Sequence, residues 1–356
     1  MYRLDNGNLK ELMLYNLLKL SKLFKYFFIL DFFIFNVHNF KNNFLVDNYM
    51  KDLHLHLSGA TDPVLLFEII NETGLKLKNK NFGKFRDSLS MKKEKVSNLE
   101  EYLSIIHNID EAQSSPKAIE RSFYKSFVDA YCAGCDYLEL RWNPYKRSQN
   151  FKIDFDKLII SARAGYERAK TIFGITGGQI FCLGRDIEVS ANDAIFKKAI
   201  QYFGKGVVGI DAAGPEETVH LKPEFENYYK TANALGMMTT IHAGERYYDG
   251  VEDTLATIIE KYQVKRIGHG VQIHKFPSLM KLAEKAGVMF EICISSNLTT
   301  QAVKNEEEFA KIFKIFEEYN IQYTICTDAV YPLDTNIALE NQRYEKIKEI
   351  AKNKTK

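Results

Sequence analysis

The sequence is poor in proline and cysteine and carries almost no net charge. Its 48 lysine and arginine residues nearly balance 46 aspartate and glutamate residues, and no basic face is interleaved with aromatic residues. The sequence therefore gives no indication of a nucleic acid or an acidic membrane as a partner. The five cysteines are an odd number without a regular framework, which indicates free thiols, a reducing compartment and hence a cytoplasmic protein.

The sequence also lacks an uncharged apolar run of the roughly 20 residues that a membrane-spanning helix needs. Residues 12–36 come nearest, being dense in leucine, phenylalanine and tyrosine, but three lysines and an aspartate interrupt them. No small-residue cleavage site of a signal peptide follows, and no stable membrane insertion is expected. Three interpretations of the N-terminal extension, residues 1–49, stay open: a signal or anchor segment that leaves membrane association open, an appended amphipathic helix, or untranslated sequence upstream of a start at Met50.

No linker rich in proline, glycine or serine divides residues 50–356, and we expect them to form one domain. Short apolar runs alternate there with longer segments of helical period. The apolar runs predict eight strands, at residues 52–57, 136–142, 178–183, 207–212, 238–242, 266–269, 288–294 and 322–327. The segments between them predict helices at residues 118–133, 154–172, 192–203, 223–235, 251–262, 277–286 and 306–319.

Strands that alternate with helices predict parallel pairing through right-handed crossovers. Eight such units in about 300 residues favour an α/β fold of the (β/α)8 barrel type over an open sheet. The long interval between the first two strands predicts extra helices that cover the barrel mouth, at residues 63–72 and 99–108. After the eighth strand, residues 341–352 predict one lysine-rich closing helix.

In a barrel of this kind the working residues lie at the C-terminal ends of the strands. The first strand carries His54 and His56, whose side chains alternation directs to the same face, about 7 Å apart. His242 ends the fifth strand and Asp328 the eighth, so that four nitrogen and oxygen donors can converge near the barrel axis. Such a set suits Zn²⁺, with Fe, Co or Mn as lesser alternatives, and a position left for water would make the site catalytic.

Two further polar residues follow strand ends in the same region, Glu245 after His242 and His269 after the sixth strand. A metal-activated water, a carboxylic acid and an imidazole together make a hydrolytic site. Taken singly, each residue is better explained as a satisfied core group or a turn cap, so the hypothesis depends on their joint placement. The Cys132-x-x-Cys135 pair has no preceding proline and no upstream His-x-Glu, so it does not match the zinc deaminases of that pattern and is predicted to be structural.

Six segments together resemble the adenosine deaminase family of metal-dependent aminohydrolases, in the order in which that family has them. They are 53–60 (LHLHLSGA), 209–216 (GIDAAGPE), 241–245 (IHAGE), 266–270 (RIGHG), 290–297 (FEICISSN) and 327–328 (TD), spread over residues 50–340. The resemblance implies a (β/α)8 barrel with one Zn²⁺ per chain, held by His54, His56, His242 and Asp328. It also implies hydrolytic deamination of adenosine, or of a related 6-aminopurine nucleoside, to inosine and ammonia in purine salvage.

The resemblance further implies a role for the residues around the metal. Glu245 would protonate the purine ring nitrogen beside the attacked carbon, and His269 would orient the attacking water. The Gly214 backbone would contact the purine, and His56 and Ser58 would line the substrate site. A purine nucleoside and water would be the reaction partners.

Two positions depart from the family's pattern. Ser58 stands where the family has an aspartate that meets the ribose, and Ala329 stands where it has a second aspartate that binds the purine ring. Asp334 either supplies the missing carboxylate or caps a helix. The departures leave the substrate open and motivate one alternative, a non-catalytic or specialised relative that binds a nucleoside or a partner. A second alternative is a metal-dependent phosphoesterase, because some such barrels begin with a segment like Asp52-Leu-His-Leu-His, although they need further ligands for additional metals.

Overall fold

The computed structural model describes residues 50–75, 81–91 and 109–353, and the N-terminal extension lies outside these ranges. The strands form two sheets, and within each sheet every strand pairs in parallel with its neighbours in the chain. One sheet contains β1 (Met50–His56), β2 (Cys135–Trp142), β3 (Thr176–Gly184), β4 (Val207–Ala213) and β5 (Met238–Thr239). The other contains β6 (His242–Ala243), β7 (Arg266–His269), β8 (Met289–Ile292) and β9 (Gln322–Ile325).

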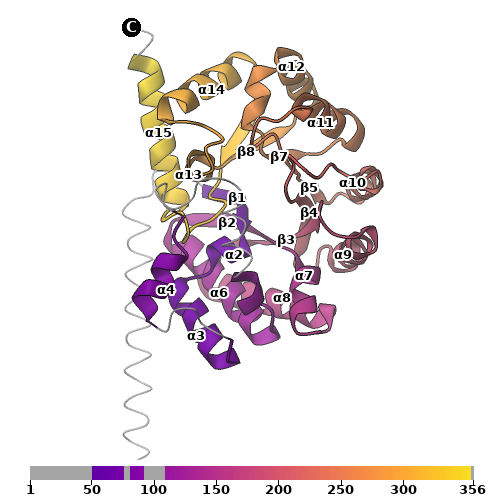
Figure 1. The fold of residues 1–356 in the computed structure, drawn as a ribbon, viewed down its shortest axis with the longest axis vertical. Coiled ribbons are helices and arrows are strands. Elements are labelled where there is room, and N and C mark those ends of the chain that lie inside the picture. The colour runs from indigo at the N-terminus through magenta and orange to yellow at the C-terminus, as the bar shows by residue number, and fades with distance from the viewer. Residues whose placement is uncertain (1–49, 76–80, 92–108, 354–356) are drawn as a thin grey trace, which may run out of the picture. The chain divides into compact units, whose positions relative to one another are not determined.

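The two sheets join into one closed barrel. β5 and β6 are two parts of the predicted fifth strand, and the residues between them bond to both neighbours: Thr240 N donates to the β4 backbone at 3.0 Å, and Ile241 O accepts from the β7 backbone at 2.8 Å. At the other seam, His56 N donates to Asp328 O at 2.9 Å, and Asp328 N donates to His54 O at 2.7 Å. Eight parallel strand positions thus surround one axis, which confirms the predicted (β/α)8 barrel (Figure 1).

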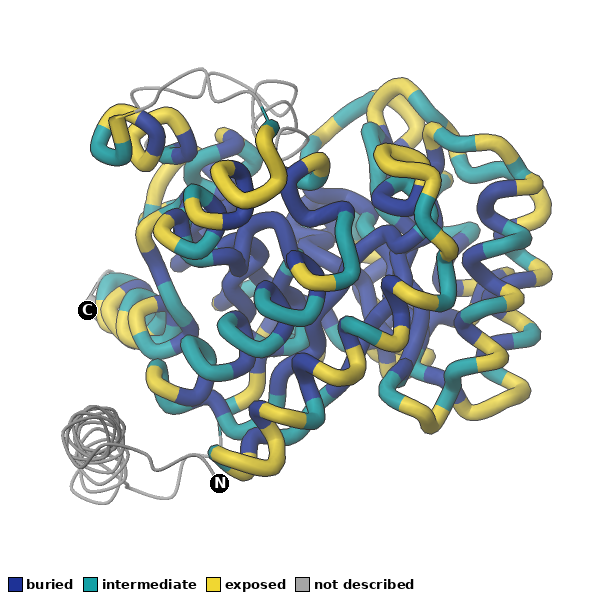
Figure 2. The backbone as a smooth tube through the Cα atoms, turned by 90° about the horizontal axis from the view of Figure 1, so that it is seen from below, coloured by how far each residue is buried: buried dark blue, intermediate teal, exposed yellow. Residues whose placement is uncertain are grey.

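Helices form a ring outside the strands (Figure 1). Between strands run α6 (Pro116–Cys132), α8 (Phe155–Phe173), α9 (Val189–Tyr202), α10 (Glu224–Ala234), α11 (Val251–Thr257) with the π-helical turn η1 (Ile258–Tyr262), α12 (Pro277–Ala286) and α14 (Glu306–Glu318), and α15 (Ile337–Asn353) follows β9. Each corresponds to a predicted helix. Their apolar stripes, such as Phe123 and Phe127 of α6, are buried against the barrel, and their outer faces are exposed (Figure 2).

The connections at the C-terminal ends of the strands contain elements that the sequence did not indicate. The predicted strand 288–294 ends early, because Ile294–Thr299 form a short helix, α13. Two further short helices, α7 (Pro144–Asn150) and the 3₁₀ helix η2 (Val271–Lys275), follow β2 and β7. Such helices are too short to show a periodic apolar pattern, which is why the sequence missed them.

The long connection after β1 contains α2 (Leu57–Ala60), α3 (Pro63–Thr73) and α4 (Phe82–Ser88). α3 confirms the helix expected at residues 63–72, and an apolar cluster with Leu66 and Phe85 joins it to α4. The helix expected at 99–108 lies outside the described residues, so the cover over the barrel mouth stays a prediction.

The barrel interior contains a buried network of charges beneath the C-terminal ends of the strands. Arg141 donates to Glu291 at 2.9 Å and to Asp211 at 3.2 Å, and Arg266 contacts both Glu291 and Glu139. Burial opposes these charges, but Arg141 and Arg266 lower the pKa of Glu291 well below its ordinary value. Glu291 is therefore ionised and held in place, which matters for the histidine that it contacts.

The start of β3 provides a test of how tightly the strands pack. Gly177 has φ +143°, and an added Cβ would lie 1.8 Å from Leu138 O on β2. Gly174, at the end of α8, also has a positive φ but has open space around it. We expect Gly174→Ala to cost about 1 kcal/mol of unfolding free energy from backbone strain alone, and Gly177→Ala to cost far more or prevent folding. Urea unfolding of both variants would show this, and equal losses would contradict the register between β2 and β3.

Candidate metal centre and active site

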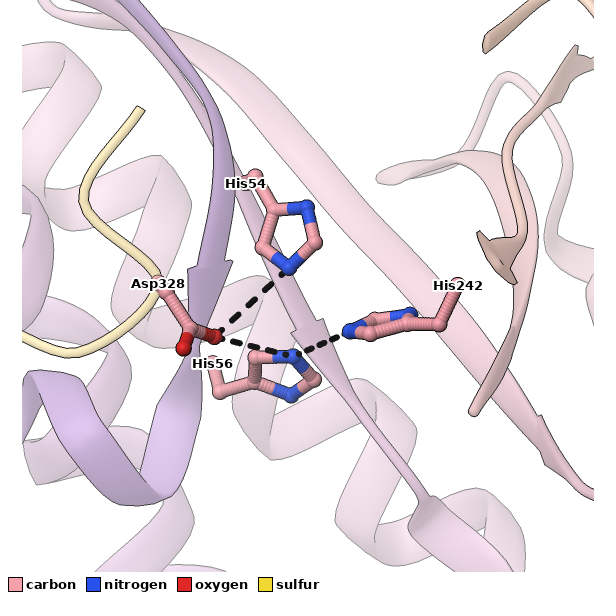
Figure 3. Close-up of side chains that lie close together, drawn as sticks. All are labelled: His54, His56, His242 and Asp328. Atoms are coloured by element: carbon pink, nitrogen blue, oxygen red, sulfur yellow. Dashed lines mark hydrogen bonds and ion pairs between the residues drawn. The ribbon is translucent and has the colours of Figure 1, made fainter. Parts of the chain in front are cut away.

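Four side chains meet at the C-terminal end of the barrel: His54 and His56 of β1, His242 of β6, and Asp328, which follows β9 (Figure 3). One ligand atom from each lies within 4.8 Å of all the others. His56 Nε2 lies 3.1 Å from His242 Nε2, and Asp328 Oδ1 lies 3.5 Å from His56 Nε2 and 3.6 Å from His54 Nε2. The rings of His54 and His56 tilt toward each other, with centroids 5.4 Å apart, closer than one strand repeat. The structure thus brings together the four predicted ligands.

The ionisation of His56, His242 and Asp328 fits a divalent cation. Burial lowers the pKa of His56 well below its ordinary value and also lowers the pKa of His242, so both rings are neutral and offer lone pairs. Burial opposes the charge of Asp328, but the nearby imidazoles of His54, His56 and His269 hold the pKa of this carboxyl well below its ordinary value. His54 Nε2 is buried and has no hydrogen-bond partner among the described residues. A ring nitrogen without a hydrogen-bond partner, such as His54 Nε2 beside the other three candidate ligands, is what a metal site needs.

Two of the three rings, those of His54 and His242, are oriented by carboxylates from the interior network. His54 Nδ1 lies 2.7 Å from Glu291, and His242 Nδ1 lies 3.0 Å from Asp211. Donation from Nδ1–H to these carboxylates leaves Nε2 of each ring free for a metal. Sequence reasoning placed Asp211 at a strand end but gave neither carboxylate a role, because contact with a histidine from another strand has no local signature.

The backbone also adapts to the site. His269 and Asp328 have φ +59° and +62°, a region that non-glycine residues rarely adopt. His269 is the last residue of β7, and Asp328 lies shortly after β9. Beside them, Gly268 has no room for a side chain, since an added Cβ would lie 2.7 Å from Cε1 of His54. Two of the seven described non-glycine residues with positive φ are therefore predicted functional residues of the site.

The predicted acid and imidazole are neighbours. Oε2 of Glu245 lies 3.8 Å from Nε2 of His269. The backbone N–H groups of Gly244 and Glu245 each donate to the Glu216 carboxylate at 2.8 Å, which fixes the turn that carries the acid. Glu216 is therefore a site residue that the sequence analysis quoted within a motif without assigning it a role.

The remaining predicted residues have different placements. Gly214 directly follows β4 at the same end of the barrel, and Ser58 is buried in α2. Ala329 directly follows Asp328 and is fully buried against α2. Asp334 instead lines a hollow of about 330 Å³ beside the end of α6, together with Asp129 and other residues outside the metal centre. The idea that Asp334 supplies the missing carboxylate is therefore wrong.

A sequence profile described as adenosine deaminase matches residues 50–355. The chain belongs to the adenosine deaminase family. The curated adenosine deaminase of Vibrio vulnificus (strain CMCP6) is 30% identical over 277 residues, which are 78% of this chain and 81% of that protein. Membership makes the chain an adenosine deaminase-like hydrolase, as the sequence predicted.

Solved structures agree on the fold. An amidohydrolase from Burkholderia ambifaria with bound zinc superposes with a TM-score of 0.72 at 20% identity, covering 83% of this chain and 79% of that one. Arabidopsis ADAL complexed with IMP superposes with a TM-score of 0.71 at 20% identity, covering 84% and 86% of the two chains. At this identity, the likeness establishes the barrel and no more.

Two other expectations can be compared with the structure. Among the described residues, the four-ligand group is the one cluster suited to a metal, whereas the phosphoesterase alternative requires further ligands. No helix in the described part of the chain is long and apolar enough to cross a membrane. Neither Cys132 nor Cys135 forms a disulfide, and the two lie where α6 ends and β2 begins, at the barrel end away from the metal centre.

Asp211 offers a test of the carboxylate–histidine contact. We expect Asp211→Asn to weaken metal affinity about 10–100-fold, because the amide no longer accepts the Nδ1–H of His242 as a charged partner. Competition with a coloured chelator would measure the affinity, and circular dichroism would confirm folding. Asp193→Asn is a matched control, since Asp193 lies on α9 and accepts a hydrogen bond from Tyr228 of α10. Equal affinities in the two variants would remove Asp211 from the site.

Proposed function

We propose that this protein hydrolyses the 6-amino group of adenosine, or of a related 6-aminopurine nucleoside, to give inosine or its analogue and ammonia. The observation that best supports this proposal is that a carboxyl group and an imidazole, those of Glu245 and His269, lie side by side at the four-ligand centre. Curated relatives named adenosine deaminase support adenosine as the first candidate. A role in cytoplasmic purine salvage follows from this proposal.

We propose one Zn²⁺ per chain, on His54, His56, His242 and Asp328. Three imidazole nitrogens and one carboxylate oxygen, without thiolate, are a common zinc donor set. The zinc-bearing amidohydrolase of the same fold adds support. A metal bound there would lower the pKa of water toward neutrality and so supply the nucleophile for hydrolysis.

The protein's own residues would carry the remaining steps. Oε2 of Glu245 would give a proton to the ring nitrogen beside the attacked carbon, which makes that carbon more electrophilic. His269 Nε2, 3.8 Å from that oxygen, would hold the attacking water by a hydrogen bond. The 6-amino group leaves as ammonia, and the oxygen of water becomes the 6-oxo group. The Gly214 backbone, His56 and Ser58 would line the purine and ribose side of the pocket.

Two residues that differ from the family's pattern, Ser58 and Ala329, mean that the precise substrate has to be found by experiment. Ser58 and Ala329 provide no carboxylate to the pocket, and Ala329 is fully buried. The second candidate, a relative that binds a nucleoside without converting it, is motivated by these positions. The complete ligand group and the neighbouring Glu245 favour catalysis, because a binding module has no need of a proton donor beside an activated water.

The substrate can be identified with a panel of aminopurines. We expect purified, zinc-loaded protein to release ammonia from adenosine with the change in ultraviolet absorbance that accompanies conversion to inosine. Adenine, AMP and N6-methylated analogues belong in the panel, because the fold neighbours include an N6-methyl-AMP deaminase and an adenine deaminase. Tight nucleoside binding without ammonia release from any compound would favour the binding-module alternative.

Glu245 provides the sharpest test of the chemistry. We expect Glu245→Gln to lower kcat by at least about 100-fold, because an amide cannot donate the catalytic proton. Metal content should stay near that of the wild type, since Glu245 is not among the ligands. Glu252→Gln, an exposed glutamate on α11, is the matched control and should remain active. A fully active Glu245→Gln variant would rule out this acid.

A further inference from the structure

The short helix α13 contacts three different groups of the active site. Ser296 Oγ donates to Asp328 Oδ2 at 2.6 Å, and the side-chain amide of Asn297 lies 3.0 Å from Nδ1 of His269. Thr300, the residue that caps the helix, donates from Oγ1 to Oε1 of Glu245 at 3.0 Å. One turn of helix after β8 therefore reaches a metal-ligand candidate, the imidazole and the acid.

α13 is itself held from outside the barrel. Glu340 of α15 is fully buried and accepts hydrogen bonds from the backbone N–H and the hydroxyl of Ser295. Arg343, one turn further along α15, donates to the same hydroxyl at 2.7 Å. The start of α13 is thus fixed by two side chains of the closing helix, so that the position of Thr300 is determined by packing and not by the substrate.

The hydrogen bond of Thr300 distinguishes the two oxygens of Glu245. Thr300 is fully buried, and its hydroxyl hydrogen has no other acceptor among the described residues. If the acid proton were on Oε1, it would donate to the Thr300 oxygen, and the hydroxyl hydrogen would be left buried without a partner. Leaving a buried donor unpaired is costly, so the favoured arrangement has Thr300 donating to Oε1 and the acid proton on Oε2.

We propose that Thr300 is a positioning residue that places the proton of Glu245 on Oε2, the oxygen that faces His269. The inference rests on the proposed function, because it concerns the orientation of the proton donor in that reaction. Oε1, held by Thr300, serves as the carbonyl-type acceptor, and Oε2 carries the proton toward the ring nitrogen of the substrate. The hydroxyl also restricts rotation of the carboxyl group, so that the proton is aimed before substrate arrives.

The test compares Thr300→Val, which removes the hydroxyl at nearly constant shape, with Thr300→Ser, which keeps it. We expect Thr300→Val to lower kcat about tenfold with little change in KM, because one hydrogen bond that orients the acid is lost. Thr300→Ser should retain most of the wild-type kcat. Thr299→Val is the matched control, since the neighbouring threonine of α13 is less buried and has no recorded hydrogen bond from its side chain in the described part of the chain.

Infrared difference spectra provide a second measurement that needs no turnover. The band of the protonated Glu245 carboxyl is the one that disappears in Glu245→Gln. In metal-loaded Thr300→Val this carbonyl band should move to higher frequency, because its hydrogen bond is gone, and it should stay in place in Thr300→Ser and Thr299→Val.

The outcomes separate this inference from the proposed function. A wild-type protein that converts no aminopurine would contradict the function, whereas the carbonyl band would still decide the role of Thr300. Absence of a protonated-carboxyl band, or a band that does not move in Thr300→Val, would overturn the inference even in an active enzyme. An unchanged kcat in Thr300→Val, or an equal loss in Thr299→Val, would overturn it as well.

Discussion

The contact between His54 and Glu291 in the barrel interior is the constraint on which the site depends. Glu291 is fully buried and stays ionised because Arg141 and Arg266 lie beside it. The carboxylate then accepts the Nδ1–H of His54 and directs Nε2 toward the other ligands. Removing a cation from this network would leave a buried carboxylate uncompensated, at a cost of several kcal/mol. The metal centre is therefore built on a charge network that is itself a substantial part of the core.

Different strand ends supply the different functional groups of the site, and this set of groups suits hydrolysis. β1 and β6 supply the imidazole donors. Asp328, in the segment after β9, completes both the candidate ligand set and the barrel, because its backbone bonds to His54 O and His56 N of β1. Distortion of the barrel seam would thus displace a ligand directly. α13 adds a second level of control, since it contacts the acid, the imidazole and Asp328 and is held by α15.

Sequence patterns located the strands and the long helices well, and they also located the candidate site residues at the strand ends. Eight apolar runs predicted the eight strand positions, and the alternation on β1 placed His54 and His56 on one face. Short helices were missed, because six residues such as those of α13 cannot display a helical period. The substitute role imagined for Asp334 was also wrong. Closeness in sequence to Asp328 suggested proximity in space, but Asp334 lines a hollow beside the end of α6 instead.

The sequence by itself determined the identity of the candidate ligands and of the candidate proton donor, and it determined the barrel, because periodicity and position at strand ends are local properties that a linear pattern records. Only the tertiary structure decided which partners orient those groups. Glu291 approaches His54 across 237 positions of sequence, and Thr300 approaches Glu245 across 55. Such contacts depend on the closure of the barrel and the packing of α15 against α13, and no short segment of the chain contains the information that sets them.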